Sequence, residues 1–103
     1  FEANPKNNPL VLTITTLFRY FLNLLTYHYQ KKTTPNTQEM ARLLGVHPFF
    51  MKDYIDGGKI YNAMKCATTI SLLREYDMKS KGVGNANISD GELLKELIFK
   101  IMH

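Results

Sequence analysis

The segment around Gly45 constrains the fold most, because it joins two helical patterns with almost no connecting chain. Residues 37–44 follow a helical pattern that Gly45 can end, since glycine adopts the left-handed conformation found after helix C-termini. Pro48 suits the first position of a new helix, where its missing N–H group would have no partner in any case. His47 can cap this second helix through its ring. The resulting corner consists of Leu44, Gly45, Val46, His47, Pro48, Phe49 and Phe50.

Two functions are open for this corner. Its proportions match a helix-turn-helix, whose second helix reads DNA bases with Arg, Asn, Gln or Ser side chains. Here the second helix starts with Phe49 and Phe50 instead, and Lys52 is the only cation of its first turn, followed by Asp53. Aromatic rings and an acidic residue are poorly suited to a groove lined by phosphates. We therefore expect Val46, Phe49 and Phe50 to pack into the core. A helix-turn-helix DNA-binding module, with Lys52 as its DNA contact, stays open as the alternative.

The composition is that of an ordinary soluble domain. A chain of 103 residues with 45% hydrophobic and 21% charged residues is expected to form one globular domain. The formal net charge of +4 permits contact with nucleic acid without requiring it, because the basic residues are spread along the chain. Cys66 is the only cysteine, so no intramolecular disulfide can form, and a reducing, cytoplasmic location is expected.

No contact with a membrane is expected. The most apolar window, residues 10–25, is shorter than the ~20 residues that a membrane-spanning helix needs, and it contains Arg19 and Asn23. This window is predicted to form a buried helix. No signal-peptide pattern is found at the start of the chain.

Helical periodicity predicts an all-α fold, a compact orthogonal bundle of about five helices. The predicted helices cover residues 10–30, 37–44, 48–56 and 62–80, and a fifth helix begins at a capping box. That box pairs Ser89 with Glu92, and the third helix is expected to end at Gly57 and Gly58. Residues 1–9 contain two Asn-Pro pairs, which predict an extended connector from an upstream region. Residues 10–103 are then the helical domain.

The first and last helices carry more apolar residues than a single buried face accommodates. Large exposed apolar patches on soluble proteins mark interfaces, so a permanent protein partner is the simplest explanation. The residues of this candidate subunit interface are Val11, Leu12, Leu22, Leu94, Ile98, Phe99 and Met102. Glu96 and Lys100, four residues apart on the same helix, are expected to form a solvated ion pair.

No catalytic, metal or cofactor site emerges from the sequence. No second His, Cys or carboxylate stands at helical ligand spacing from His47. Cys66 lacks an evident base partner and is expected to be a small core residue. Residues 82–84 read Gly-Val-Gly, but no strand precedes them to support a dinucleotide site. The chain is therefore not expected to be an enzyme.

Three stretches resemble a known family. Residues 41–52, Ala-Arg-Leu-Leu-Gly-Val-His-Pro-Phe-Phe-Met-Lys, closely resemble a motif in the C-terminal domain of the delta subunit of bacterial DNA polymerase III. Residues 73–77 followed by 79–82 resemble the leucine-rich helix of that family, and residues 93–98 resemble its closing apolar helix. The sequences of residues 4–9 and 77–91 are similar to those of Bacteroidetes-type members. The resemblance spans nearly the whole chain.

This resemblance implies a role in a clamp loader. The family's C-terminal domain joins the equivalent domains of the tau/gamma and delta-prime subunits in a helical collar. By this resemblance, the full-length subunit would carry two more N-terminal domains of the AAA+ type, of which the first opens the sliding clamp, and the delta subunit itself does not hydrolyse ATP. By this resemblance the chain supports assembly of the loader that places the clamp on DNA during replication. It would then meet the clamp only through the missing domains, and DNA only indirectly or weakly.

Overall fold

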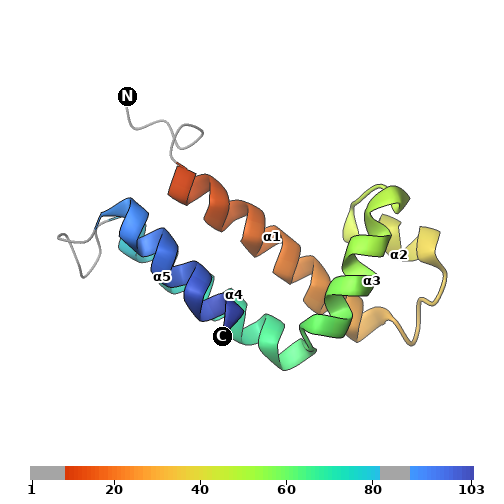
Figure 1. The fold of residues 1–103 in the computed structure, drawn as a ribbon. Helices are drawn as coiled ribbons and strands as arrows, with labels where there is room; N and C mark the ends of the chain where they lie inside the picture. The colour runs from red at the N-terminus through yellow and green to blue at the C-terminus, as the bar shows by residue number, and fades with distance from the viewer. Residues whose placement is uncertain (1–8, 82–88) are drawn as a thin grey trace. The chain divides into compact units, whose positions relative to one another are not determined.

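The computed structural model describes residues 9–81 and 89–103, and within these ranges the protein is all-α, as predicted. The described part of the chain contains no strand (Figure 1). Its elements are α1 (Pro9–Gln30), α2 (Thr37–Leu44), the 3₁₀ segment η2 (Pro48–Phe50), α3 (Met51–Ile60), α4 (Ala63–Ser80) and α5 (Asp90–Met102). The predicted connector lies outside the described residues except for Pro9, which begins α1.

The chain divides into two compact units, each described by itself below. Among the described residues, the first unit comprises residues 9–19, 69–81 and 89–103, and the second unit comprises residues 20–68. The N-terminal half of α1, the C-terminal part of α4 and all of α5 belong to the first unit. The rest of α1 and α4, together with α2, η2 and α3, belongs to the second unit.

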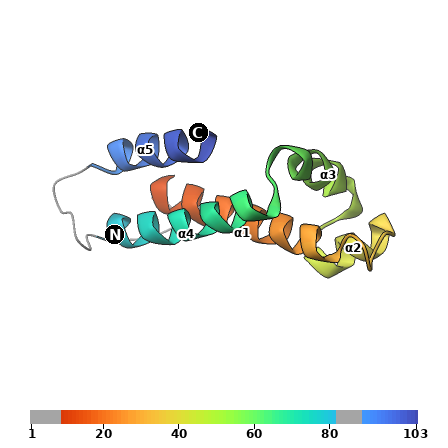
Figure 2. The same ribbon diagram turned by 90° about the horizontal axis from the view of Figure 1, so that it is seen from below.

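In the first unit, α5 lies antiparallel to α4 (Figure 2). Each of its helices turns one row of apolar side chains inward at helical spacing. The buried residues of this unit are Leu10, Ile14, Thr69, Ile70, Leu73, Tyr76, Leu93, Leu97 and Ile101. At the start of α5, the Glu92 N–H donates to the Ser89 hydroxyl at 3.2 Å, which confirms the predicted N-cap.

The second unit is built around the corner between α2 and α3. At the start of α2, the Asn36 side chain accepts hydrogen bonds from the N–H groups of Gln38 and Glu39 at 2.8 and 3.1 Å. Gly45 ends α2 in the left-handed conformation, with φ 73°, as predicted. The core residues of this unit are Phe21, Leu24, Met40, Ala41, Leu44, Met51, Tyr54, Gly57 and Cys66.

The predicted end of the third helix at Gly57 and Gly58 is wrong. α3 continues through both glycines to Ile60. A Cβ added to Gly57 would overlap the Tyr20 hydroxyl, and one added to Gly58 would stand 3.1 Å from a Tyr27 ring carbon. These glycines therefore allow α3 to approach two tyrosines of α1 closely, rather than ending the helix.

The predicted extent of the first helix, residues 10–30, agrees with α1, but the prediction that this helix is buried and too short to span a membrane needs correction. α1 has 22 residues and a mean hydropathy of 1.3 over its most apolar 18-residue window. It is therefore long and apolar enough to cross a membrane by length and composition alone. Only 22% of that window is buried in the described structure, mainly Leu10, Ile14, Phe21 and Leu24. The helix extends beyond the apolar window of residues 10–25 to Gln30, in agreement with its predicted range.

Candidate protein-association surface

The outward side of α5 in the first unit carries a continuous apolar surface. Ile98, Phe99 and Met102 are all exposed, and the Phe99 side chain keeps 63% of its accessible surface. Residues three and four positions apart are neighbours on a helix, so these three side chains form one patch. We call this patch the α5 outer face. Leu93, Leu97 and Ile101 fill the buried side of the same helix.

A polar contact between α4 and α5 holds the α5 outer face in place. The hydroxyl of Tyr76, a side chain with no accessible surface, donates a short hydrogen bond to Glu96 Oε1. Lys100 Nζ lies 3.7 Å from the same carboxylate oxygen and 5.3 Å from the Tyr76 ring centroid. Lys79 Nζ lies 4.7 Å from that centroid. The tyrosine thus contacts two ammonium groups through its ring and one carboxylate through its hydroxyl.

The charges in this contact favour its observed protonation. Burial, followed by the hydrogen bond to Glu96, raises the pKa of Tyr76, so its hydroxyl keeps its proton. The hydrogen bond from Tyr76 lowers the pKa of the Glu96 carboxyl, which therefore stays ionised. The Glu96–Lys100 pair is part of this contact, so its prediction as a merely solvated ion pair was incomplete.

The role of Tyr76 was not predicted from the sequence. The signal that could have found it is its place in a helical row with Cys66, Thr69 and Leu73, all of which are buried. The Tyr76 hydroxyl at the end of this row needs a hydrogen-bond partner, because burying a hydroxyl without one costs free energy. The carboxylate of Glu96 meets this need.

The other predicted interface residues differ in exposure. Leu12 in the first unit and Leu22 in the second are exposed, whereas Val11 and Leu94 are half-buried. Leu22 belongs to a different unit from the other six, so the structure does not assign all seven predicted residues to one surface.

A shallow hollow between α1 and α4 adds to the apolar surface of the first unit. It has a volume of about 240 Å³ and is lined by Ile14, Thr15, Phe18, Leu73, Arg74 and Asp77. The Arg74 guanidinium carbon lies 5.9 Å from the Phe18 ring centroid. Asp77 is paired with Lys81 at 3.1 Å. The hollow therefore has an apolar floor and charged groups at its rim.

At the corner of the second unit, the prediction that Phe49 and Phe50 pack into the core is wrong. Phe49 is 79% exposed and Phe50 is 50% exposed. Pro48–Phe50 forms a 3₁₀ turn, and the core position falls to the next residue, Met51, which is 2% exposed. The two phenylalanine rings contact each other edge to face, with centroids 5.5 Å apart.

The remaining corner residues have structural roles. Leu44 is buried, Val46 is half-buried, and Gly45, His47 and Pro48 are exposed. His47 Nδ1 accepts the Phe49 N–H at 2.9 Å, which confirms the expected cap through the ring. The partial burial of Val46 supports only part of the packing role predicted for it.

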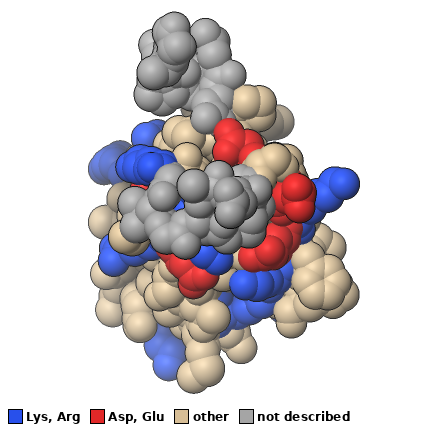
Figure 3. Space-filling view, turned by 90° about the vertical axis from the view of Figure 1, so that its left-hand side faces the viewer, with Lys and Arg blue, Asp and Glu red and all other residues tan. Residues whose placement is uncertain are grey.

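The excess of basic over acidic residues is larger in the second unit than in the first. Its charged residues are Lys31, Lys32, Arg42, Lys52, Lys59 and Lys65 against Glu39, Asp53 and Asp56. None of these takes part in an ion pair within residues 20–68, whereas the pairs seen among the described residues, such as Lys79 with Glu75, lie in the first unit. Figure 3 faces the side of the first unit where α4 ends and α5 begins, and there acidic and basic side chains lie next to one another. Lys52 is exposed, with the exposed Asp53 beside it.

The described residues hold no cluster of three or more His, Cys, Asp or Glu side chains that could bind a metal ion. Cys66 is fully buried, as predicted, and its thiol lies 3.7 Å from the Tyr61 carbonyl oxygen. Burial raises the pKa of this thiol, so it is mainly protonated at neutral pH. The Gly-Val-Gly stretch at 82–84 lies outside the described residues.

Comparison of the chain with protein-family models, with curated proteins and with solved structures finds no match.

Proposed function

We propose that this chain is a helical protein-association domain. The observation that carries the proposal is the α5 outer face, on which three large apolar side chains are exposed side by side. Burying one such side chain in an interface contributes about 1.5–3 kcal/mol. Aromatic residues at the centre of an interface often dominate its binding energy, so Phe99 is the expected anchor.

The hydrogen bond between Tyr76 and Glu96 supports the same proposal. It connects α5 to α4 within the first unit, so the outer face is preformed. A preformed surface loses less conformational freedom on binding than a mobile one. The hollow lined by Phe18 and Leu73 offers a second apolar contact on this unit.

We further propose that the association is that of a clamp-loader collar, on the basis of the resemblance of residues 41–52, 73–82 and 93–98 to the delta subunit of bacterial DNA polymerase III. The partners would be the collar domains of the tau/gamma and delta-prime subunits in the cytoplasm. In this role the domain catalyses no reaction and holds subunits together while other domains act on the sliding clamp.

Mixing the domain with those collar domains and measuring the mass of the species in solution tests this proposal. A complex of defined stoichiometry at micromolar concentration is expected. Persistence of separate monomers at that concentration would rule out the collar role.

A DNA-binding module remains the second candidate, and two observations favour it. Phe49 and Phe50 are exposed, and exposed aromatic rings can stack on nucleobases. The second unit also has an excess of basic residues without ion-pair partners. Against it, the charged residues of α3 balance, because Lys52 and Lys59 stand with Asp53 and Asp56.

Duplex DNA binding at several salt concentrations separates the two candidates. A DNA-binding module predicts an affinity that falls steeply with salt and is lost in the Lys52→Glu variant. An association domain predicts that Lys52→Glu leaves complex formation unchanged.

A further inference from the structure

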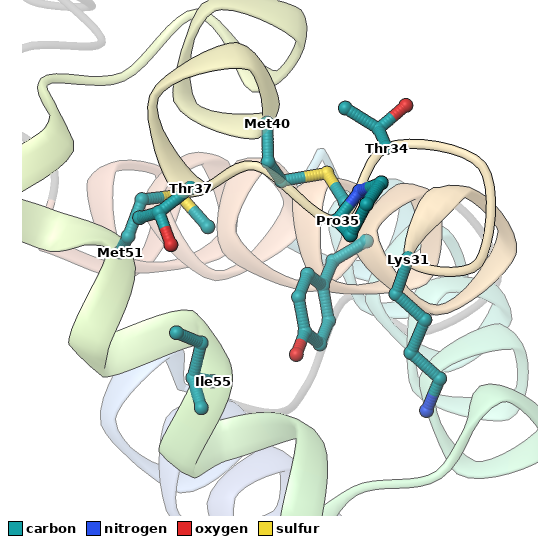
Figure 4. A pocket seen from close by; sticks show the side chains of 8 residues that line it. Lys31, Thr34, Pro35, Thr37, Met40, Met51 and Ile55 are labelled. Carbon is teal, nitrogen blue, oxygen red and sulfur yellow. The ribbon is translucent and has the colours of Figure 1, made fainter.

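The second unit contains a pocket that the proposed function does not use. Its volume is about 310 Å³, at the lower end of the range for small-molecule sites. It lies between the end of α1, the segment that follows it, α2 and α3 (Figure 4). The lining residues are Tyr27, Lys31, Thr34, Pro35, Thr37, Met40, Met51 and Ile55.

One side of this pocket is apolar and belongs to the core. Met40 reaches it from α2, and Met51 and Ile55 reach it from α3 (Figure 4). Both methionines are 2% exposed and form the fixed floor of the pocket, whereas Tyr27, Pro35 and Ile55 supply most of its accessible apolar surface. Methionine side chains adapt well to irregular apolar ligands.

The polar side chains that line the pocket can all donate a hydrogen bond, and none carries a negative charge. Lys31 supplies an ammonium group, and Tyr27, Thr34 and Thr37 supply hydroxyls. Within residues 20–68, Lys31 forms no ion pair. The acidic residue of α2, Glu39, does not line this pocket, but with Arg42 it lines an adjacent hollow that shares Thr34.

We propose that this pocket binds a small apolar monocarboxylate. The hydrocarbon part would lie against Tyr27, Pro35 and Ile55, above the floor formed by Met40 and Met51, and the carboxylate would meet the Lys31 ammonium group. A single cation among the lining residues suits one negative charge better than the two of a phosphate monoester. At about 30 Å³ for each non-hydrogen atom, the pocket accommodates roughly ten such atoms. Octanoate has this size, and it is the probe for the test.

The five methionines provide the readout for a titration with octanoate. In protein labelled with ¹³C at the methionine methyl groups, the signals of Met40 and Met51 should shift and saturate. Met64, Met78 and Met102 are exposed and should stay in place, because they report only non-specific contact with hydrocarbon. The expected Kd is on the order of 1 mM, the affinity of about ten ligand atoms at modest efficiency.

Two neighbouring lysines give a matched pair of variants. Lys31→Met should weaken octanoate binding about three- to fivefold, as loss of an exposed charge pair does. Lys32→Met is the control, because Lys32 is also exposed but does not line the pocket. Octan-1-ol, which lacks the charge, should bind the unsubstituted protein more weakly than octanoate.

Three results would overturn the proposal. The first is no shift of Met40 and Met51 up to about 10 mM octanoate, ten times the expected Kd. The second is an equal shift of all five methionine signals. The third is an equal affinity of the Lys31→Met and Lys32→Met variants. These results do not bear on the association proposal, because the pocket lies in the second unit and the α5 outer face lies in the first.

Discussion

Alanine in place of Gly57 tests how closely α3 approaches α1 in the second unit. A Cβ at this position would overlap the Tyr20 hydroxyl and stand 3.3 Å from the Tyr20 Cζ atom. The Tyr20 ring has little room to turn aside, because it stacks on Tyr54 with centroids 5.2 Å apart. Overpacking costs about 1–3 kcal/mol, whereas alanine gains about 1 kcal/mol over glycine inside a helix. The Gly57→Ala variant should therefore lose about 1 kcal/mol of unfolding free energy.

Urea unfolding followed by circular dichroism measures this loss as a lower transition midpoint. The Tyr20→Phe variant supplies the control, because it removes the overlapping hydroxyl and only a weak 3.4 Å hydrogen bond to the Asp53 carbonyl. In that background Gly57→Ala should be nearly neutral, which gives a coupling energy of about 1 kcal/mol between the two sites. If Gly57→Ala stabilises the unsubstituted protein, or has the same effect in both backgrounds, the close approach is refuted.

Three further predictions test the Tyr76–Glu96 hydrogen bond, the opposite burial of Phe49 and Met51, and the burial of Cys66. Tyr76→Phe should lower the melting temperature at pH 7. The hydrogen bond from Tyr76 lowers the pKa of Glu96 in the folded state, so its stabilisation is present above the unfolded carboxyl pKa of about 4.3 and is lost as the pH falls through the lower folded-state pKa. The melting curves of the two proteins should therefore converge as the pH falls toward 3. Phe49→Ala should change the unfolding free energy by less than about 0.5 kcal/mol, whereas Met51→Ala should cost about 2–5 kcal/mol, and equal losses in urea unfolding would contradict the assigned burial. Cys66 should react with iodoacetamide far more slowly in the native protein than in urea, as mass spectrometry can follow, and fast native labelling would mean an accessible thiol.

Local signals in the sequence predicted several helix ends, though not the end of α3. The caps at Gly45, His47 and Ser89 depend on backbone groups two or three residues away, so a short stretch of sequence contains all the partners. The all-α class followed from helical periodicity over the chain. The inward row of α5 followed from the same spacing.

Features that depend on distant partners were not predicted. The continuation of α3 through Gly57 depends on Tyr20, which lies 37 positions earlier in the sequence. The local turn at residues 48–50 was not predicted either. Because these residues form a 3₁₀ turn, Met51 takes the core position and Phe49 is left exposed. Composition alone could not distinguish a 3₁₀ turn from an α-helical one.

The candidate surfaces show the same division. The exposed residues of the α5 outer face were predicted, because their spacing places them outside the helix face that Leu93, Leu97 and Ile101 bury. The Tyr76–Glu96 contact joins two helices, and the pocket at Lys31 is formed by three elements and a connecting segment. Neither can be found from the pattern of any one element.

The most direct test of the association proposal is the affinity of the domain for its partner collar domains, measured by sedimentation velocity with and without Phe99→Asp. Phe49→Asp is the matched control, because Phe49 is an equally large exposed aromatic residue in the second unit. The proposal predicts that Phe99→Asp weakens the complex at least about tenfold, while Phe49→Asp leaves it unchanged. A folded Phe99→Asp variant that binds as tightly as the unsubstituted domain would contradict the central role of the α5 outer face.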